Sequence, residues 1–149
     1  MSKARILVVE DEPGMRLAMD RILRSYGYDV ATAADGIDGL AEFRRMPADL
    51  VIADLYLPDK DGLETIVDLM KELPIPKIIA MSGHRAKDLM LQSAERLGAL
   101  EVIHKPFSAE SLAAVVARVL RKKKAASATT PGAPNYPKAS AQTRSRPAC

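Results

Sequence analysis

LVIADLYLPDKDG, residues 50–62, is the stretch that decides the fold. Its first five residues are an apolar run that ends in the carboxylate of Asp54, and Pro58 and Gly62 belong to the loop that follows. A run of Val, Ile, Leu and Ala without polar alternation is typical of a strand that is covered on both faces of a parallel sheet. The stretch therefore predicts a buried strand with an acid at its carboxyl end.

Apolar runs of this kind occur five times, and segments with helical spacing separate them. The predicted strands are Arg5–Val9, Asp29–Ala33, Leu50–Asp54, Lys77–Met81 and Leu100–His104. Gly27 is expected to cap the C-terminus of the first helix, and Ser108 the N-terminus of the last. Five βα units with short links predict an α/β fold, a doubly wound parallel five-stranded sheet with helices on both faces.

The charged residues are unevenly distributed along the 149 residues. Lys138, Arg144 and Arg146 account for the whole formal net charge of +3, so residues 1–124 carry 19 basic and 19 acidic side chains. A globular part this neutral has no overall electrostatic footprint for nucleic acid. We therefore expect no direct binding to nucleic acid.

Composition also divides the chain. After Lys124 the sequence is rich in Ala, Ser, Thr and Pro without apolar periodicity, which predicts one domain at residues 1–124 and a disordered tail or linker at 125–149. No apolar run approaches the roughly 20 residues that cross a bilayer, and the N-terminus does not resemble a signal peptide. Cys149 is the single cysteine, so no internal disulfide can form. These features predict a cytoplasmic protein without membrane contact.

Polar and charged side chains stand at the predicted strand ends. In parallel α/β sheets, ligands gather beyond the carboxyl ends of the strands. The residues at these ends are Glu10, Asp11 and Glu12 after the first strand, Asp54 on the third, Ser82 on the fourth and Lys105 after the fifth. Taken singly, such an acid is more often a loop or cap residue.

Brought together, the carboxylates need compensation. Two unit charges about 4 Å apart repel by roughly 4 kcal/mol at an effective dielectric constant near 20. A divalent, oxygen-seeking cation removes this cost, and Mg²⁺ commonly takes one or two carboxylates together with phosphate oxygens and water. The acids therefore predict a Mg²⁺ site, and Lys105 is predicted to be a partner for phosphate.

The motifs, in their order, resemble the receiver domain of response regulators in bacterial two-component systems, such as the chemotaxis regulators. They lie within about residues 4–122 and are Val8 to Glu12, Asp54 to Gly62, Ser82-Gly83 and Lys105 to Phe107. The resemblance implies a flavodoxin-like fold and a signalling role. It also implies that the domain is no enzyme for a separate substrate and catalyses only its own Mg²⁺-dependent phosphorylation and dephosphorylation.

The resemblance also implies roles for residues that would contact the phosphoryl group. Asp54 would be the nucleophile that takes this group from a phosphohistidine on a sensor histidine kinase or phosphotransfer protein. Lys105 would pair with the phosphoryl group, Ser82 would bond one of its oxygens, and a cis peptide bond before Pro106 would aim the lysine. The resulting conformational switch would control a downstream protein target that the sequence does not identify.

The metal would be held by residues from two strand ends. The resemblance implies that Asp11, Asp54 and the backbone carbonyl of Tyr56 bind Mg²⁺, with Glu10 contributing directly or through water. Tyr56 and His84 would flank the phosphorylation site and tune the lifetime of the phosphoryl group.

Three positions depart from the common pattern of the family. Glu10 stands where many relatives have aspartate, and Ser82 where threonine is frequent. Val102 stands where many receivers carry the Tyr or Phe that turns inward when the hydroxyl moves. The absence of this aromatic ring questions whether phosphorylation is transmitted, as is usual in the family, through the surface of the fourth helix, the fifth strand and the fifth helix.

Two other classes of protein share part of this pattern. A phosphohydrolase of the haloacid-dehalogenase type also combines Asp, Lys, Ser or Thr and Mg²⁺, but it expects a second acid two residues after the nucleophile, where this chain has Tyr56. A flavodoxin-like cofactor binder would want a phosphate-cradling loop after the first strand. Glu10, Asp11 and Glu12 would instead repel phosphate.

Overall fold

The computed structural model describes residues 3–57, 62–83 and 88–123. Strands and helices alternate without exception along this part of the chain. The elements are β1 (Arg5–Val9), α1 (Pro13–Ser25), β2 (Asp29–Ala33), α2 (Gly36–Arg45), β3 (Leu50–Asp54), α3 (Gly62–Met70), β4 (Lys77–Ser82), α4 (Asp88–Leu97), β5 (Glu101–His104) and α5 (Ala109–Arg121).

The five predicted strands are confirmed, with small shifts at two ends. The first three have the predicted bounds, whereas β4 extends to Ser82 and β5 begins at Glu101. Leu100 lies outside β5, although its N–H still donates to the carbonyl of Ile78 at 2.8 Å.

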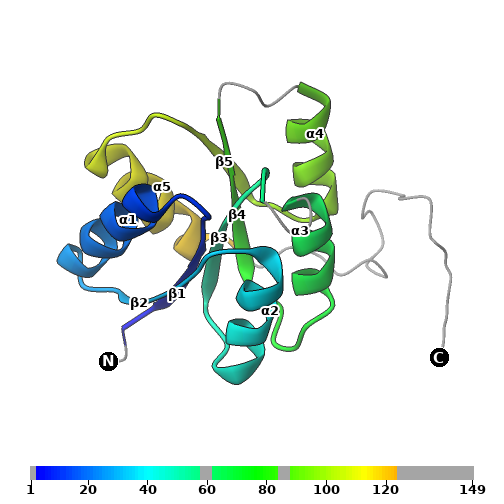
Figure 1. Cartoon of the computed structure of the whole chain (residues 1–149), viewed down its shortest axis with the longest axis horizontal. Helices are drawn as coiled ribbons and strands as arrows, with labels where there is room; N and C mark the ends of the chain where they lie inside the picture. The colour runs from blue at the N-terminus through cyan, green and yellow to red at the C-terminus, as the bar shows by residue number, and fades with distance from the viewer. Residues whose placement is uncertain (1–2, 58–61, 84–87, 124–149) are drawn as a thin grey trace, which may run out of the picture.

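All strands are parallel and form one sheet in the order β2-β1-β3-β4-β5. Helices α1 and α5 cover one face of the sheet, and α2, α3 and α4 cover the other (Figure 1). This confirms the doubly wound, flavodoxin-like prediction. The strand order reverses between β1 and β3, the switch point at which such sheets bind ligands beyond the carboxyl ends of the strands.

The core has two layers because successive strand residues point to opposite faces. Ile6 and Val8 of β1 pack beneath α1 and α5, whereas Leu7 and Val9 pack beneath α2 and α3. Every residue of β3 is buried, so burial on both faces is confirmed for this strand. The same expectation is wrong for β2, which lies at an edge and leaves Asp29 and Thr32 exposed.

Both predicted helix caps are confirmed. Gly27 has a positive φ of 93°, and it lets the N–H of Tyr28 reach the carbonyl of Leu23 at 3.2 Å while its own N–H bonds Arg24. Ser108 caps α5 and forms a reciprocal capping box with Ser111.

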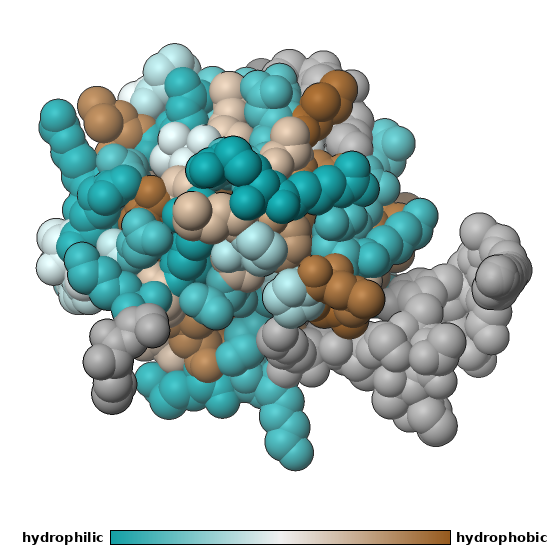
Figure 2. Space-filling model, turned by 90° about the horizontal axis from the view of Figure 1, so that it is seen from below, coloured by the Kyte–Doolittle hydropathy of each residue, from teal (hydrophilic) through white to brown (hydrophobic). Residues whose placement is uncertain are grey.

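The face in Figure 2 is mostly hydrophilic, with hydrophobic side chains in small separate groups. None of the helices in the described ranges is long and apolar enough to cross a bilayer. The predicted tail at 125–149, as well as Pro58 and His84, lies outside the described residues.

Candidate phosphoryl and metal site

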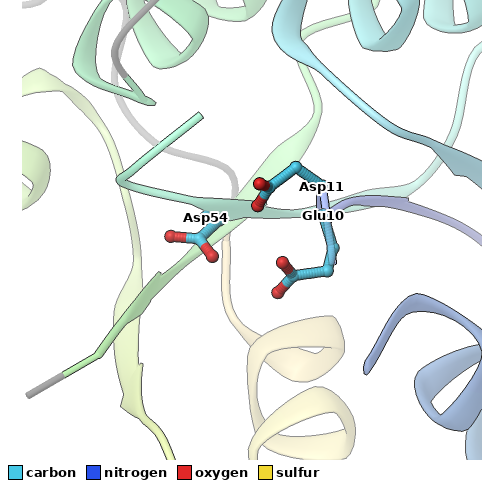
Figure 3. A group of neighbouring side chains, drawn as sticks. All are labelled: Glu10, Asp11 and Asp54. Carbon is cyan, nitrogen blue, oxygen red and sulfur yellow. The ribbon is translucent and has the colours of Figure 1, made fainter. Parts of the chain in front are cut away.

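The switch point brings three carboxylates together. Glu10 and Asp11 follow β1, and Asp54 ends the neighbouring strand β3. One carboxylate oxygen from each lies within 4.8 Å of the others, and Figure 3 shows the three side chains turned toward a common space. Glu10 is fully buried, Asp54 is 5% exposed and Asp11 is exposed.

Lys105 forms ion pairs with two of these acids. Its Nζ lies 2.6 Å from Oε1 of Glu10 and 2.6 Å from Oδ2 of Asp54. One ammonium against three carboxylates leaves an excess of two formal negative charges. A bound divalent cation would therefore neutralise this excess negative charge.

Burial and ion pairing act against each other on the pKa values here. Burial raises the pKa of Glu10 above its usual value, although the hydrogen bonds from Lys105 and the N–H of Glu12 oppose it. Burial alone would lower the pKa of Lys105, but hydrogen bonds to Asp54 and Glu10 outweigh it, so this pKa is raised. Lys105 thus stays charged at neutral pH.

The carboxylate of Asp54 is fixed at both oxygens. Oδ1 accepts a hydrogen bond from the N–H of Tyr56 at 2.9 Å, and Oδ2 accepts one from Lys105. Behind it, Gly62 donates its N–H to the carbonyl of Leu55 at 3.0 Å. A Cβ on Gly62 would lie only 2.3 Å from the backbone oxygen of Asp54. Gly62 therefore has a structural role, because the start of α3 packs directly on the end of β3.

Glu12 differs in role from the two acids before it. Its Oε1 accepts from the N–H of Met15 at 2.6 Å and its Oε2 from that of Gly14 at 3.2 Å, which caps α1. Arg16, a residue that the sequence analysis missed, donates to the carbonyls of Glu10 at 2.9 Å and Asp11 at 3.2 Å. Its place in the first turns of α1, just after the acids, was the available signal.

Ser82 is fully buried at the end of β4, two strands from β1. Its Oγ lies 3.0 Å from Nδ1 of His104, the last residue of β5. His104 was not among the site residues predicted from the sequence. The available signal was its position directly before Lys105, at the end of the fifth predicted strand; the structure adds that the parallel register pairs it with Ser82.

Two smaller expectations concern β5 and the segment after it. The Lys105–Pro106 peptide bond is cis, as predicted. Val102 is partly buried and packs against the core layer beneath α2, α3 and α4.

The donor set suits a hard divalent cation. Carboxylate oxygens are the ligands that Mg²⁺ and Ca²⁺ prefer, and two of the three acids are already held in position by hydrogen bonds. Glu10, Asp11 and Asp54 could therefore hold a metal ion.

Comparison with known proteins supplies an independent line of evidence. Residues 6–117 match the family described as "Response regulator receiver domain". The "Probable transcriptional regulator ycf27" of Porphyridium aerugineum is 38% identical over 122 residues, which is 82% of this chain and 50% of that protein. "Sensory transduction protein RegX3" of Mycolicibacterium smegmatis is 33% identical over 117 residues, 78% of this chain and 50% of that one. The chain thus spans about half the length of these curated relatives.

Solved structures give the same result. The receiver domain of NtrX from Brucella abortus superposes with a TM-score of 0.74 at 34% identity, covering 79% of this chain and 99% of that one. A CheY-like response regulator receiver domain protein from Methanospirillum hungatei JF-1 superposes with a TM-score of 0.76 at 30% identity, covering 80% and 94%.

Proposed function

This chain belongs to the response-regulator receiver family of two-component signal transduction, and from that premise we propose that Asp54 is the residue that accepts the phosphoryl group. One observation carries the assignment: the carboxylate of Asp54 ends β3 at the switch point, bonded to Lys105 and within reach of two further acids. In this arrangement the nucleophile, a cation for the phosphoryl group and a metal site share one edge of the sheet.

The transfer uses Asp54 as an oxygen nucleophile. A carboxylate oxygen forms a bond to phosphorus while the bond from phosphorus to the donor's imidazole nitrogen breaks, and the electron pair of that bond stays on the nitrogen. The hydrogen bond from the N–H of Tyr56 orients the attacking carboxylate. Lys105, which pairs with Asp54 before transfer, then pairs with the phosphoryl oxygens, and the hydroxyl of Ser82 bonds one of them.

Mg²⁺ fits the site as its cofactor, with Glu10, Asp11, Asp54 and the backbone carbonyl of Tyr56 as the residues that would hold it. When bound, it would supply positive charge that offsets the clustered carboxylates and the charge on the transferring oxygens. Arg16 supports this arrangement from the protein side, because it holds the carbonyls of the Glu10-Asp11 turn.

The remaining assignments rest on the family and on the composition of the chain. We propose that residues 1–124 form the receiver domain and that 125–149, which lie outside the described residues, form a tail or linker. The proposed phosphoryl donor is a sensor histidine kinase or a phosphotransfer protein, and the proposed output is a protein target that is not identified. The chain itself is expected to be cytoplasmic and, from the balanced charge of residues 1–124, not to bind nucleic acid directly. The domain acts only on its own phosphorylation state.

The two alternative classes are less well supported. Tyr56 occupies the position of the second acid of haloacid-dehalogenase-type phosphohydrolases, and its side chain is 42% exposed. A flavodoxin-like cofactor binder would need a phosphate-binding loop after β1, where this chain has carboxylates. One of them, Glu12, accepts hydrogen bonds from N–H groups at the start of α1 that would otherwise bind phosphate.

The test is acetyl phosphate labelling in Mg²⁺, followed by intact-mass measurement. Wild type should gain one phosphoryl group, and Asp54→Asn none. Asp38→Asn is a matched control, because Asp38 is an exposed acid on α2, and it should label like wild type. Equal labelling of wild type and Asp54→Asn would refute the assignment.

A further inference from the structure

The contact between Ser82 and His104 joins the phosphoryl site to the edge of the sheet. The two residues are register partners on β4 and β5, and Oγ and Nδ1 are 3.0 Å apart. Ser82 is fully buried, whereas His104 is exposed. A buried hydroxyl is thus bonded to a side chain that reaches the solvent.

The backbone around this contact is held in place. The N–H of Lys105 donates to the carbonyl of Ser82 at 2.8 Å, and the side chain of Lys105 is itself bound to Glu10 and Asp54. The ends of β4 and β5 therefore cannot separate without breaking contacts of the site. The simplest way for Ser82 to change partner is to rotate its hydroxyl.

A serine hydroxyl has one proton to donate. Because Ser82 is fully buried, that proton has to go to an acceptor. Among the described residues, Nδ1 of His104 lies at hydrogen-bond distance from Oγ of Ser82, and it can accept this proton when the ring carries its own hydrogen on Nε2. A phosphoryl oxygen on Asp54 is also an acceptor, and it needs the same proton.

We propose that His104 is a positioning residue for the phosphoryl switch: it holds the proton of the Ser82 hydroxyl in the resting protein and competes for it with the phosphoryl group on Asp54. This rests on the proposed phosphorylation of Asp54. His104 touches neither the phosphoryl group nor the metal ligands in this scheme and acts through Ser82.

This competition lowers the apparent affinity of the site for the phosphoryl group by a measurable factor. A ligand's apparent affinity falls in proportion to the fraction of protein that is ready to receive it. One neutral hydrogen bond is worth between about twofold and tenfold in such an equilibrium. Removing the acceptor at His104 should strengthen the phosphorylated state by that factor.

The test uses beryllofluoride with Mg²⁺ as a stand-in for the phosphoryl group, with affinity measured by titration of the full chain. His104→Phe keeps a ring but has no nitrogen, and it should bind beryllofluoride about two- to tenfold more tightly than wild type. His104→Asn places an amide near Nδ1 and should restore the wild-type affinity. In the Ser82→Ala background, His104→Phe should have no further effect.

Three results would overturn the proposal: equal or weaker binding by His104→Phe, no restoration by His104→Asn, or a His104 effect that persists in Ser82→Ala. A second measurement does not depend on the His104 variants folding. The Nδ1 resonance of His104 in wild type should report an unprotonated, hydrogen-bonded nitrogen that changes in Ser82→Ala and on adding beryllofluoride, and an unchanged resonance would also refute the idea. Failure of wild type to bind beryllofluoride at Asp54 would instead refute the proposed function.

Discussion

Glu101 on β5 and Arg118 on α5 form a two-point salt bridge, with Nε 2.5 Å from Oε2 and Nη2 2.6 Å from Oε1. Lys122 adds a third contact at 3.0 Å. The hydrogen bond from Arg118, followed by that from Lys122, lowers the pKa of Glu101 from 4.5 to about 2 against the effect of burial. The interaction ties the edge strand to the last helix.

This salt bridge predicts a specific dependence of stability on pH. Because the folded pKa of Glu101 lies below its unfolded value, the stabilisation is fully present above pH 4.5 and is lost as the pH falls through about 2. Arg118 is half exposed, so solvent screening keeps the contribution of this salt bridge to the unfolding free energy small. Urea unfolding of wild type and Glu101→Gln at pH 6, 4 and 3 measures it. The difference in unfolding free energy between wild type and Glu101→Gln should decrease from pH 6 to pH 3. A difference that stays constant would contradict the prediction.

Removing Asp11 should weaken metal binding while stabilising the metal-free fold. Asp11 is an exposed carboxylate within 4.8 Å of two buried ones, and Arg16 contacts its backbone oxygen, so Asp11→Ala leaves the turn intact. Less like-charge repulsion should raise the unfolding free energy without Mg²⁺ by about 1 kcal/mol. Added Mg²⁺ should stabilise wild type but not Asp11→Ala, and phosphoryl transfer should lose most of its rate.

Thermal unfolding with and without MgCl₂ measures this effect, with Asp38→Asn as the control for loss of a surface acid. If Asp11→Ala is stabilised by Mg²⁺ as much as wild type, and labels at the same rate, Asp11 is no ligand.

Gly62 should tolerate no side chain, although it begins a helix. The Cβ of Gly62→Ala would lie 2.3 Å from the backbone oxygen of Asp54 and 2.4 Å from Cα of Leu55. Backbone must shift to relieve this contact, which should cost about 1–3 kcal/mol of unfolding free energy and slow the labelling of Asp54. Gly83→Ala is the matched control, since a Cβ there meets no atom of the described residues within 4 Å. If Gly62→Ala and Gly83→Ala have equal urea midpoints, the start of α3 can move away from β3 without loss of stability, and the prediction is wrong.

Sequence patterns predict the strands well because each of β1, β3 and β4 must be apolar on both faces to lie inside the sheet. The same physics places Glu10, Asp54 and Lys105 together, since parallel strands end at one edge. The exposed face of β2 was not predicted, because the alternation of polar and apolar residues that marks an edge strand is weak in its five residues.

Contacts between side chains on neighbouring elements were harder to predict. Glu12 directly follows two candidate ligands in the sequence, and the geometry of α1 shows that it caps this helix. The pairing of Ser82 with His104 depends on the register of β4 against β5. A shift by one residue would point His104 to the other face of the sheet, and the sequence alone does not determine this register.

The segment 125–149 should be dispensable for folding and phosphorylation. It lies outside the described residues, and its composition lacks core-forming periodicity. Deleting it should leave the melting temperature and the labelling rate within error. A substantial loss of stability would show that the segment docks on the domain.

The last prediction concerns Val102 and the way phosphorylation is transmitted. A receiver switches because the phosphoryl group binds better to one of two existing conformations, and the shift cannot exceed that difference in affinity. Val102 is β-branched, with restricted side-chain torsion, and it already packs against the core layer beneath α4. It therefore has no exposed rotamer comparable to that of an aromatic ring, and we expect it to stay in place.

Ser82 and Gly83 should instead respond first, together with the following segment 84–87, which lies outside the described residues. Helix α4 should shift more than the surface of β5. Backbone amide and methyl resonances with and without beryllofluoride measure this. Changes should concentrate at Ser82, Gly83 and α4, while the methyl signals of Val102 move little. Because the rotamer of valine is read directly from its methyl couplings, a large rotameric change at Val102 would show that this strand still switches without an aromatic ring, and the prediction would be wrong.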